Sequence, residues 1–217
     1  MFVTEIIQVL TNKSNPANLE GMRRFGIDSS KALGVPMPEV RKLAKSIKKD
    51  HVLALELWET GIREAQILAS LIDDPKLVTS LQMDTWVKDF NSWDLCDQVC
   101  GNLFDRTPYA MEKALLYSSN NEEFIKRAGF VLMAAFAVHN KKADNELFIG
   151  LLPVIEREAW DDRNFVKKAV NWALWQIGKR NPELRLAAIA SANRILLQNT
   201  RAARWIAANA LRELAAA

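Results

Sequence analysis

The chain has 217 residues, of which 49% are hydrophobic and 25% are charged, and this composition is typical of a globular protein with a sizeable core. No run of about 18 apolar residues occurs, so we expect no membrane span and no membrane partner. The first residues lack the basic flank and apolar run of a secretory signal, and we therefore expect a cytoplasmic protein.

Helical periodicity begins near the N-terminus, and glycine and proline are scarce, at 8 and 7 residues. We expect helices over residues 4–10 and 16–25, followed by an irregular stretch over residues 26–36. Pro38 starts the next expected helix, which is apolar on one face and basic on the other. The basic residues of that segment are Arg41, Lys42, Lys45, Lys48 and Lys49.

The remaining segments continue the helical pattern. Asp50 is expected to cap a helix over residues 51–59, Thr107 and Pro108 to cap and start one over 109–117, and Thr200 to cap the last, over 200–214. The other expected helices cover residues 62–72, a segment through Leu81, Trp86 and Phe90, and residues 93–105, 122–138, 144–160, 164–179 and 182–197.

These segments alternate helix, short turn and helix, and no convincing pair of strands is found. Successive pairs begin at irregular steps of roughly 24 to 42 residues, which favours degenerate HEAT-type repeats over a four-helix bundle. We predict an all-α fold, a HEAT-like helical-repeat solenoid of antiparallel helix pairs with a concave basic face. Because no linker divides the chain, we expect a single domain over residues 1–217.

The cysteines and histidines give no sign of a metal site. Cys96 and Cys100 lie four apart on one predicted helix, where a disulfide has poor geometry, so we expect reduced, packed thiols. His51 and His139 stand far apart without ligands at metal-binding spacing. No Gly-rich phosphate loop occurs, and we expect no nucleotide and no other cofactor.

Charge is spread unevenly along the chain. Residues 21–49 contain eight basic and two acidic side chains, residues 50–120 contain five and twelve, and residues 121–217 contain fifteen and ten. An acidic middle segment between two basic terminal segments indicates a polyanionic partner, with carboxylates at the reaction site. Solvated helix faces explain any single pair of Lys or Arg residues equally well.

The stretch from Ser92 to Cys100 is expected to open a helix. Ser92 is its expected N-cap, and Asp94 lies in the first turn, where its charge complements the helix dipole. Trp93 and Asp97 are four apart and therefore share one face. A large π surface beside a fixed carboxylate suits a substrate that becomes positive as it reacts. The alternative is that Trp93 is core and Asp97 is solvated or capping.

Basic and aromatic side chains interleave over residues 164–182. Trp172 shares a helical stripe with Phe165, and Lys168 and Trp175 lie a turn apart on its edge. Such a pattern suits DNA binding, in which charge contacts phosphate and a π face contacts base or sugar. The alternative is that both tryptophans pack in the core.

Four motifs in this order resemble the AlkD-like DNA alkylation repair family, which are HEAT-like-repeat DNA glycosylases. They lie at residues 34–43, 92–97, 124–127 and 164–182, so the resemblance spans most of the chain. It implies that Asp97 is the catalytic aspartate, with Trp93 as an active-site tryptophan and Trp172 as a second one across a cleft. It also implies that Arg127 holds the DNA backbone near the lesion.

The resemblance implies a monofunctional DNA glycosylase of base excision repair, a hydrolase that releases cationic N3- or N7-alkylated purines without cleaving the strand. Its partner is double-stranded DNA containing alkylated bases, and we expect a monomer. Further phosphate contacts are expected from Lys126, Lys167, Lys168, Lys179 and Arg180. Residues 200–206 depart from the family pattern, which leaves the substrate preference open. Two alternatives remain, a catalytically silent relative that binds DNA structure and a helical-repeat scaffold for a protein partner.

Overall fold

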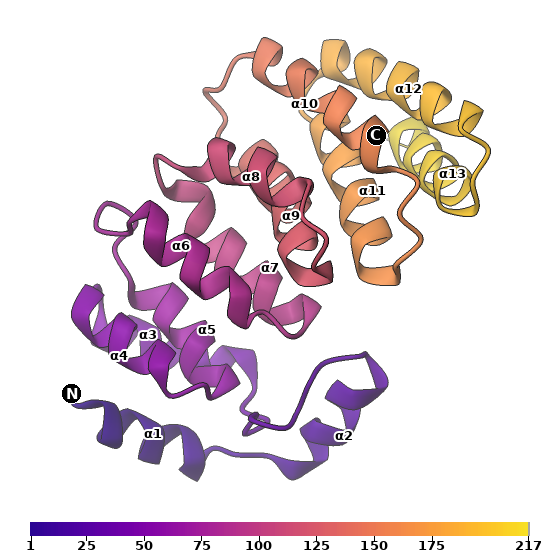
Figure 1. The fold of residues 1–217 in the computed structure, drawn as a ribbon. Coiled ribbons are helices and arrows are strands. Elements are labelled where there is room, and N and C mark those ends of the chain that lie inside the picture. The colour runs from indigo at the N-terminus through magenta and orange to yellow at the C-terminus, as the bar shows by residue number, and fades with distance from the viewer. Residues whose placement is uncertain (217) are drawn as a thin grey trace. The chain divides into compact units, whose positions relative to one another are not determined.

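In the computed structural model, the described part of the chain (residues 1–216) forms thirteen α-helices and two short 3₁₀ helices and contains no strand (Figure 1). The all-α prediction is therefore confirmed. The chain separates into two compact units, the first over Met1–Pro108 and the second beginning at Tyr109. The single domain over residues 1–217 stays a prediction. None of the described helices is long and apolar enough to cross a membrane.

The first unit is built around one central helix. Its elements are α1 (Val3–Asn12), α2 (Pro16–Arg24), α3 (Met37–Ile47), α4 (His51–Glu59), α5 (Arg63–Ile72), α6 (Ser80–Trp86), η1 (Val87–Asp89), α7 (Trp93–Asn102) and η2 (Phe104–Arg106). Helix α5 packs against α1, α3, α4 and α7, and its residues 64–70 are all buried. Burial of that whole segment makes α5 the scaffold on which α3 and α7 are placed.

An aromatic cluster fills the core beside α4 and α6. The rings of Trp58 and Trp86 stack in parallel with centroids 3.9 Å apart, and Phe90 and Phe104 pack around them. The indole N–H of Trp58 donates to Asp89 Oδ2 at 2.7 Å, so the polar edge of this buried ring is satisfied. These two tryptophans and two phenylalanines therefore stabilise the fold rather than mark a site.

The irregular stretch between α2 and α3 is held in place by a buried carboxylate. Glu64 on α5 accepts hydrogen bonds from the backbone N–H groups of Leu33 and Gly34, both at 2.9 Å. Gly34 has φ of +73°, and a Cβ there would lie 2.3 Å from the carbonyl oxygen of Asn15. Glycine is therefore required at this position, and the loop is fixed at its C-terminal end.

The second unit contains α8 (Ala110–Ser118), α9 (Glu123–His139), α10 (Asn145–Glu158), α11 (Asn164–Gly178), α12 (Pro182–Leu197) and α13 (Arg201–Ala215). Helix α9 packs between α8 and α11, and α11 packs against α9, α12 and α13. Contacts occur in the same order along α11 and α13, since Lys167 lies over the ring of Trp205 and Lys179 pairs with Glu213 at 3.4 Å. The two helices therefore run in the same direction, as equivalent helices of successive repeats do.

Most expected helix bounds agree with the structure, and those over residues 51–59 and 182–197 are identical to α4 and α12. The side chains of Asp50 and Thr200 cap their helices as predicted, accepting from Leu53 N and Ala203 N. The helix expected over residues 93–105 ends earlier, at Asn102, because the backbone leaves helical geometry at residue 103 and continues as a 3₁₀ turn.

Two predicted caps are wrong. Ser92 occupies the N-cap position of α7, but its buried hydroxyl donates to Asn91 Oδ1 at 3.3 Å and caps no helix N–H group. Thr107 does not cap α8, because its hydroxyl donates back to the carbonyl oxygen of Phe104 at 2.8 Å and the N-cap residue is Tyr109. In both cases a local acceptor competes successfully with the helix terminus.

Candidate functional site

Helix α7 places Trp93 and Asp97 one turn apart in the first unit. Both side chains are half-buried, whereas Asp94, Leu95 and Cys96 between them are buried. The indole N–H of Trp93 donates to the backbone carbonyl of Phe25, just after α2, at 2.9 Å. This bond fixes the indole in place, so the aromatic surface and the carboxylate are presented together from a rigid helix.

The neighbouring carboxylate, Asp94, has a different role. It is 6% exposed and accepts from Arg63 through Nε at 2.6 Å and also through Nη2. Since Arg63 is the first residue of α5, this pair ties the N-terminus of α7 to that of α5. Asp94 is thus committed to structure, and Asp97 is the α7 carboxylate with solvent access. The sequence suggested no partner for Asp94 beyond the helix dipole.

The cysteines of α7 are buried free thiols, as predicted. Burial, reinforced by the adjacent Cys96, raises the pKa of the Cys100 thiol well above its usual value. A protonated, inaccessible thiol is neither a nucleophile nor a metal ligand. Among the described residues, no group of three or more His, Cys, Asp or Glu side chains is placed to hold a metal ion.

In the second unit, Lys126 lies in a buried ion cluster. The residue is 4% exposed, and its ammonium contacts Glu158 at 2.7 Å and Asp161 at 3.1 Å. Its Nζ also lies 4.8 Å from the ring centre of Trp160. The ammonium is enclosed by protein groups that neutralise it, and the phosphate contact of Lys126 stays a prediction.

The carboxylates of this cluster are held ionised by their partners. Burial raises the pKa of Glu158, but hydrogen bonds from Lys126 and Arg157 outweigh it, and the net pKa is lowered. Burial likewise raises the pKa of Asp161, and the hydrogen bonds from Arg163 and then Lys126 outweigh it. The cluster joins α9 to the end of α10 and the start of α11.

Arg127 follows Lys126 on α9 and is also buried, at 5% exposure. Its Nη1 donates to the carbonyl oxygen of Phe165 on α11 at 2.6 Å, and the rings of Phe124 and Phe165 pack 5.6 Å apart beside it. Arg127 therefore links α9 to the first turn of α11. Its phosphate contact stays a prediction.

Helix α11 carries the basic and aromatic residues that the sequence singled out. Trp172 and Trp175 are half-buried and Lys168 is exposed, so the site role of Trp172 and the alternative of core packing both stay open. Lys167 pairs with Asp162 at 3.1 Å, and Lys179 lies 4.0 Å from the ring centre of Trp175. Lys168 is the cation of this helix with the most open position.

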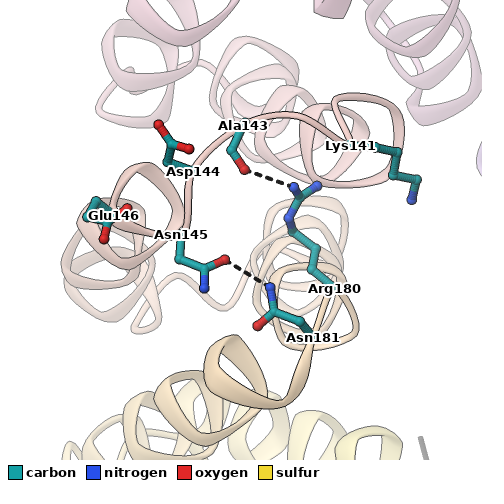
Figure 2. A pocket seen from close by; sticks show the side chains of 7 residues that line it. All are labelled: Lys141, Ala143, Asp144, Asn145, Glu146, Arg180 and Asn181. Carbon is teal, nitrogen blue, oxygen red and sulfur yellow. Dashed lines mark hydrogen bonds between the residues drawn. The ribbon is translucent and has the colours of Figure 1, made fainter.

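Arg180 is directed into the second unit. Its guanidinium lies 4.0 Å from the ring centre of Phe148 and donates to the carbonyl oxygens of Ala137 and Ala143. Burial lowers the pKa of Arg180. Figure 2 shows the side chain reaching toward Ala143. The guanidinium is thus used within the fold, and its phosphate contact stays a prediction.

The hollow beside Arg180 has a volume of about 450 Å³ and is lined by Lys141, Ala143, Asp144, Asn145, Glu146, Arg180 and Asn181 (Figure 2). Two acidic and two basic side chains balance each other there. Asn181 Nδ2 donates to Asn145 Oδ1 at 2.9 Å, so the two helix starts at α10 and α12 are joined by side chains. The balance of charge gives this hollow no preference for an anion.

Comparison with known proteins identifies the family. The family model described as DNA alkylation repair enzyme matches residues 6–214, which include nearly all of both units. The chain belongs to the DNA alkylation repair enzyme family. The predicted resemblance is thus confirmed. A search of curated protein sequences found no significant match.

A solved structure supports the fold of this DNA alkylation repair family member. It is described as "A new family of proteins related to the HEAT-like repeat DNA glycosylases with affinity for branched DNA structures". The TM-score is 0.80 at 20% sequence identity, over 89% of this chain and 83% of that chain. The HEAT-like-repeat fold is therefore established by family and by structure.

One element of the candidate site was missed by sequence reasoning. Phe25 contributes a backbone carbonyl, and a carbonyl leaves no mark on side-chain patterns. The only signal was the position of residue 25 directly before a stretch too irregular to be helical.

Proposed function

We propose that this chain is a monofunctional DNA glycosylase that hydrolyses the N-glycosidic bond of cationic N3- or N7-alkylated purines in duplex DNA. The observation that carries the proposal is the pairing of Trp93 and Asp97 on α7, both partly open, with the indole anchored on Phe25. Membership of the DNA alkylation repair family supports the substrate class.

The reaction needs little acid catalysis. An alkylated purine is already cationic, so when the glycosidic bond breaks its electron pair returns to the base, which leaves neutral. Positive charge then develops on the deoxyribose. Water forms the new bond at C1′ and gives up a proton, and the carboxylate of Asp97 is the group that orients this water and accepts the proton.

The main contribution of the protein to the rate is electrostatic stabilisation of the positive charge that develops on the sugar. Removing one preorganised group of this type typically lowers the rate by about 10²–10³. The indole of Trp93 adds cation–π attraction of about 0.5–2 kcal/mol, depending on how far water is excluded. We propose the same role for Trp172 in the second unit.

Phosphate contacts are proposed for the cations of α11. Lys168 is exposed, and Lys167 and Lys179 each have a surface-exposed carboxylate partner that a phosphate can replace. We also propose a phosphate contact for Arg127, whose Nη1 already donates to the carbonyl oxygen of Phe165. We propose that the protein acts as a cytoplasmic monomer without a cofactor or metal.

A second candidate function is recognition of DNA structure without excision. It is favoured by one observation, the similarity in fold to a protein described as having affinity for branched DNA. The two candidates differ in what they require of Asp97. A glycosylase needs its carboxylate for chemistry, whereas a structure-binding protein gains nothing from a negative charge facing DNA.

The test compares wild-type protein with Asp97→Asn on duplex DNA carrying 7-methylguanine. We expect the variant to lose at least about 100-fold in single-turnover release while binding DNA as tightly as wild type or more tightly. Asp84→Asn, a carboxylate on α6, is the matched control for charge and should leave release unchanged. Equal release by wild type and Asp97→Asn would remove Asp97 from the mechanism.

A further inference from the structure

A hollow of about 370 Å³ in the first unit is lined by four cationic side chains. Arg41 and Lys45 lie on α3, and Lys48 and Lys49 follow directly after it. All four residues are exposed. None of the described residues that line the hollow is acidic, so the positive charge is not neutralised at the rim.

The sequence of α3 explains how these charges gather. The helix is amphipathic, with Val40 buried on one side, and Arg41 and Lys45 lie four residues apart, on one face of the helix. Lys48 and Lys49 come directly after the last turn and add their charges to the same hollow. Ala44 from the same helix and Leu71 from α5 add apolar surface, so the hollow combines an apolar part with a cationic rim.

The backbone at Lys48 is unusual. Its φ is +68° and its ψ is −154°, a region that only glycine occupies without strain. Glycine at this position would end α3 at no steric cost. A lysine held there instead indicates that the side chain, and not the backbone conformation, is what the position requires.

Lys49 is fixed within the same cluster. Its ammonium donates to the carbonyl oxygen of Leu71 at 3.2 Å and to that of Asp73, at the C-terminal end of α5. Burial, and next the nearby charge of Arg106, lower the pKa of Lys49, while Asp73 and Asp74 oppose the shift. Arg106 on one side and two carboxylates on the other therefore act on Lys49 in opposite directions, and the positive character of the hollow comes from its own four cations.

We propose that this hollow binds the sugar–phosphate backbone of a DNA arm that flanks the reaction site. The proposal rests on the proposed function, since it takes DNA as the partner. The rim cations complement phosphate, and the apolar surface of Ala44 and Leu71 suits the deoxyribose between phosphates. A repeated, charged and partly apolar polymer matches this combination better than a small anion does.

The hollow and the candidate site share helix α7. Asn102 lines the hollow and lies five residues beyond Asp97 on that helix. The hollow therefore belongs to the same unit as Asp97, as a contact to DNA that flanks the nucleotide at Asp97 requires.

The first experiment measures the salt dependence of binding to unmodified 20-base-pair duplex DNA with the full chain. Each phosphate contact contributes about 0.9 to the slope of log affinity against log salt. Arg41→Gln/Lys45→Gln/Lys48→Gln should lower the slope by about 2–3 and the affinity at least about tenfold. The matched control, Lys42→Gln/Lys88→Gln/Lys142→Gln, removes three exposed cations that do not line the hollow. An equal loss in this control would overturn the proposal.

The strain at Lys48 gives a sharper test. Lys48→Gly should raise the melting temperature, because the strain is relieved, and yet weaken DNA binding about two- to fivefold by loss of one phosphate contact. Few substitutions outside a binding site stabilise the fold and weaken binding together. Unchanged affinity in Lys48→Gly would contradict the proposal.

Neutral methylphosphonate linkages locate the contact. One neutral linkage is moved step by step along duplex DNA that contains 7-methylguanine, and binding is measured with Asp97→Asn protein. At one flanking position the neutral linkage should weaken binding, and it should have no effect there once Arg41, Lys45 and Lys48 are replaced. An equal loss of affinity in both proteins at every position would overturn the contact. Binding to phosphatidylserine vesicles that depends on these cations, without any effect on DNA, would assign the hollow to a lipid surface instead.

Failure of this proposal is distinct from failure of the proposed function. If wild-type protein releases no 7-methylguanine but the salt slopes of the triple variant and its control differ as expected, the DNA contact at the hollow is supported and the glycosylase assignment is wrong. If release occurs but the triple variant and its control bind DNA alike, only the DNA contact at the hollow is wrong.

Discussion

Lys126→Met tests whether the buried cluster of the second unit is structural. Methionine replaces the unbranched apolar stem of lysine and removes the ammonium that contacts Glu158 and Asp161. Breaking a buried ion pair from one side typically costs about 3–5 kcal/mol. Here Glu158 keeps Arg157 at 2.7 Å and Asp161 keeps Arg163 at 2.6 Å, so we expect the lower end, about 3 kcal/mol.

For a domain or chain of this size, 1 kcal/mol shifts the melting temperature by about 2–4 °C, so Lys126→Met should melt about 6–12 °C lower than wild type. The assay is thermal unfolding followed by circular dichroism, with DNA affinity measured well below both transitions. Affinity should stay within about twofold of wild type. A melting temperature within 2 °C of wild type, together with a large loss of affinity, would refute the structural role and support the predicted phosphate contact of Lys126.

The same cluster predicts a dependence of stability on pH. The pKa values of Glu158 and Asp161 are lowered in the folded state from ordinary values of 4.5 and 3.8. A lowered folded pKa stabilises the protein above the unfolded pKa, and this contribution is lost as the pH falls through the folded pKa. Unfolding free energy should therefore drop below about pH 4.5 in wild type, and drop less steeply in Lys126→Met. Equal slopes in the two proteins would contradict this assignment.

Three further substitutions separate chemistry from packing. Trp93→Phe keeps an aromatic ring but loses the hydrogen bond to the Phe25 carbonyl, so the rate of base excision should fall while the free energy of unfolding changes by only about 1 kcal/mol. An unchanged excision rate would show that this hydrogen bond does not contribute to catalysis. Trp172→Ala should lower single-turnover release more than the loss of folded protein explains, and a proportional loss would make Trp172 a packing residue. Arg127→Ala should lower the free energy of unfolding by about 1.5–3 kcal/mol, because the hydrogen bond to Phe165 is lost. If Arg127 also contacts a phosphate, the variant should bind DNA with a flatter salt dependence, and an unchanged salt dependence would exclude that contact.

Much of the fold could be predicted because it depends on local patterns. Apolar periodicity and the side chains of Asp50 and Thr200 specify where helices lie and how two of them begin. Ser92 and Thr107 show the limit of that reasoning. Each has a capping side chain at a plausible position, but a nearer acceptor, Asn91 Oδ1 or the carbonyl of Phe104, takes the hydroxyl hydrogen.

The candidate site was harder to predict because burial depends on tertiary contacts. Lys126 and Arg180 have the residue type of phosphate contacts, and no local pattern revealed that Asp161 pairs with the first and that the carbonyl of Ala143 accepts from the second. Lys45 belongs to a segment that the sequence describes only as the basic face of an amphipathic helix. Its place in a hollow follows from the packing of α3 on α5, which no local pattern specifies.

The most direct test of the central claim is the identity of the product that wild-type protein forms from duplex DNA containing a single 7-methylguanine. We predict free 7-methylguanine and an equal amount of abasic sites, with the strand intact until it is treated with alkali. The same reaction with Asp97→Asn should yield neither product at a measurable rate. Tight, salt-dependent DNA binding by wild type without release of the base would contradict the glycosylase account and favour recognition of DNA structure.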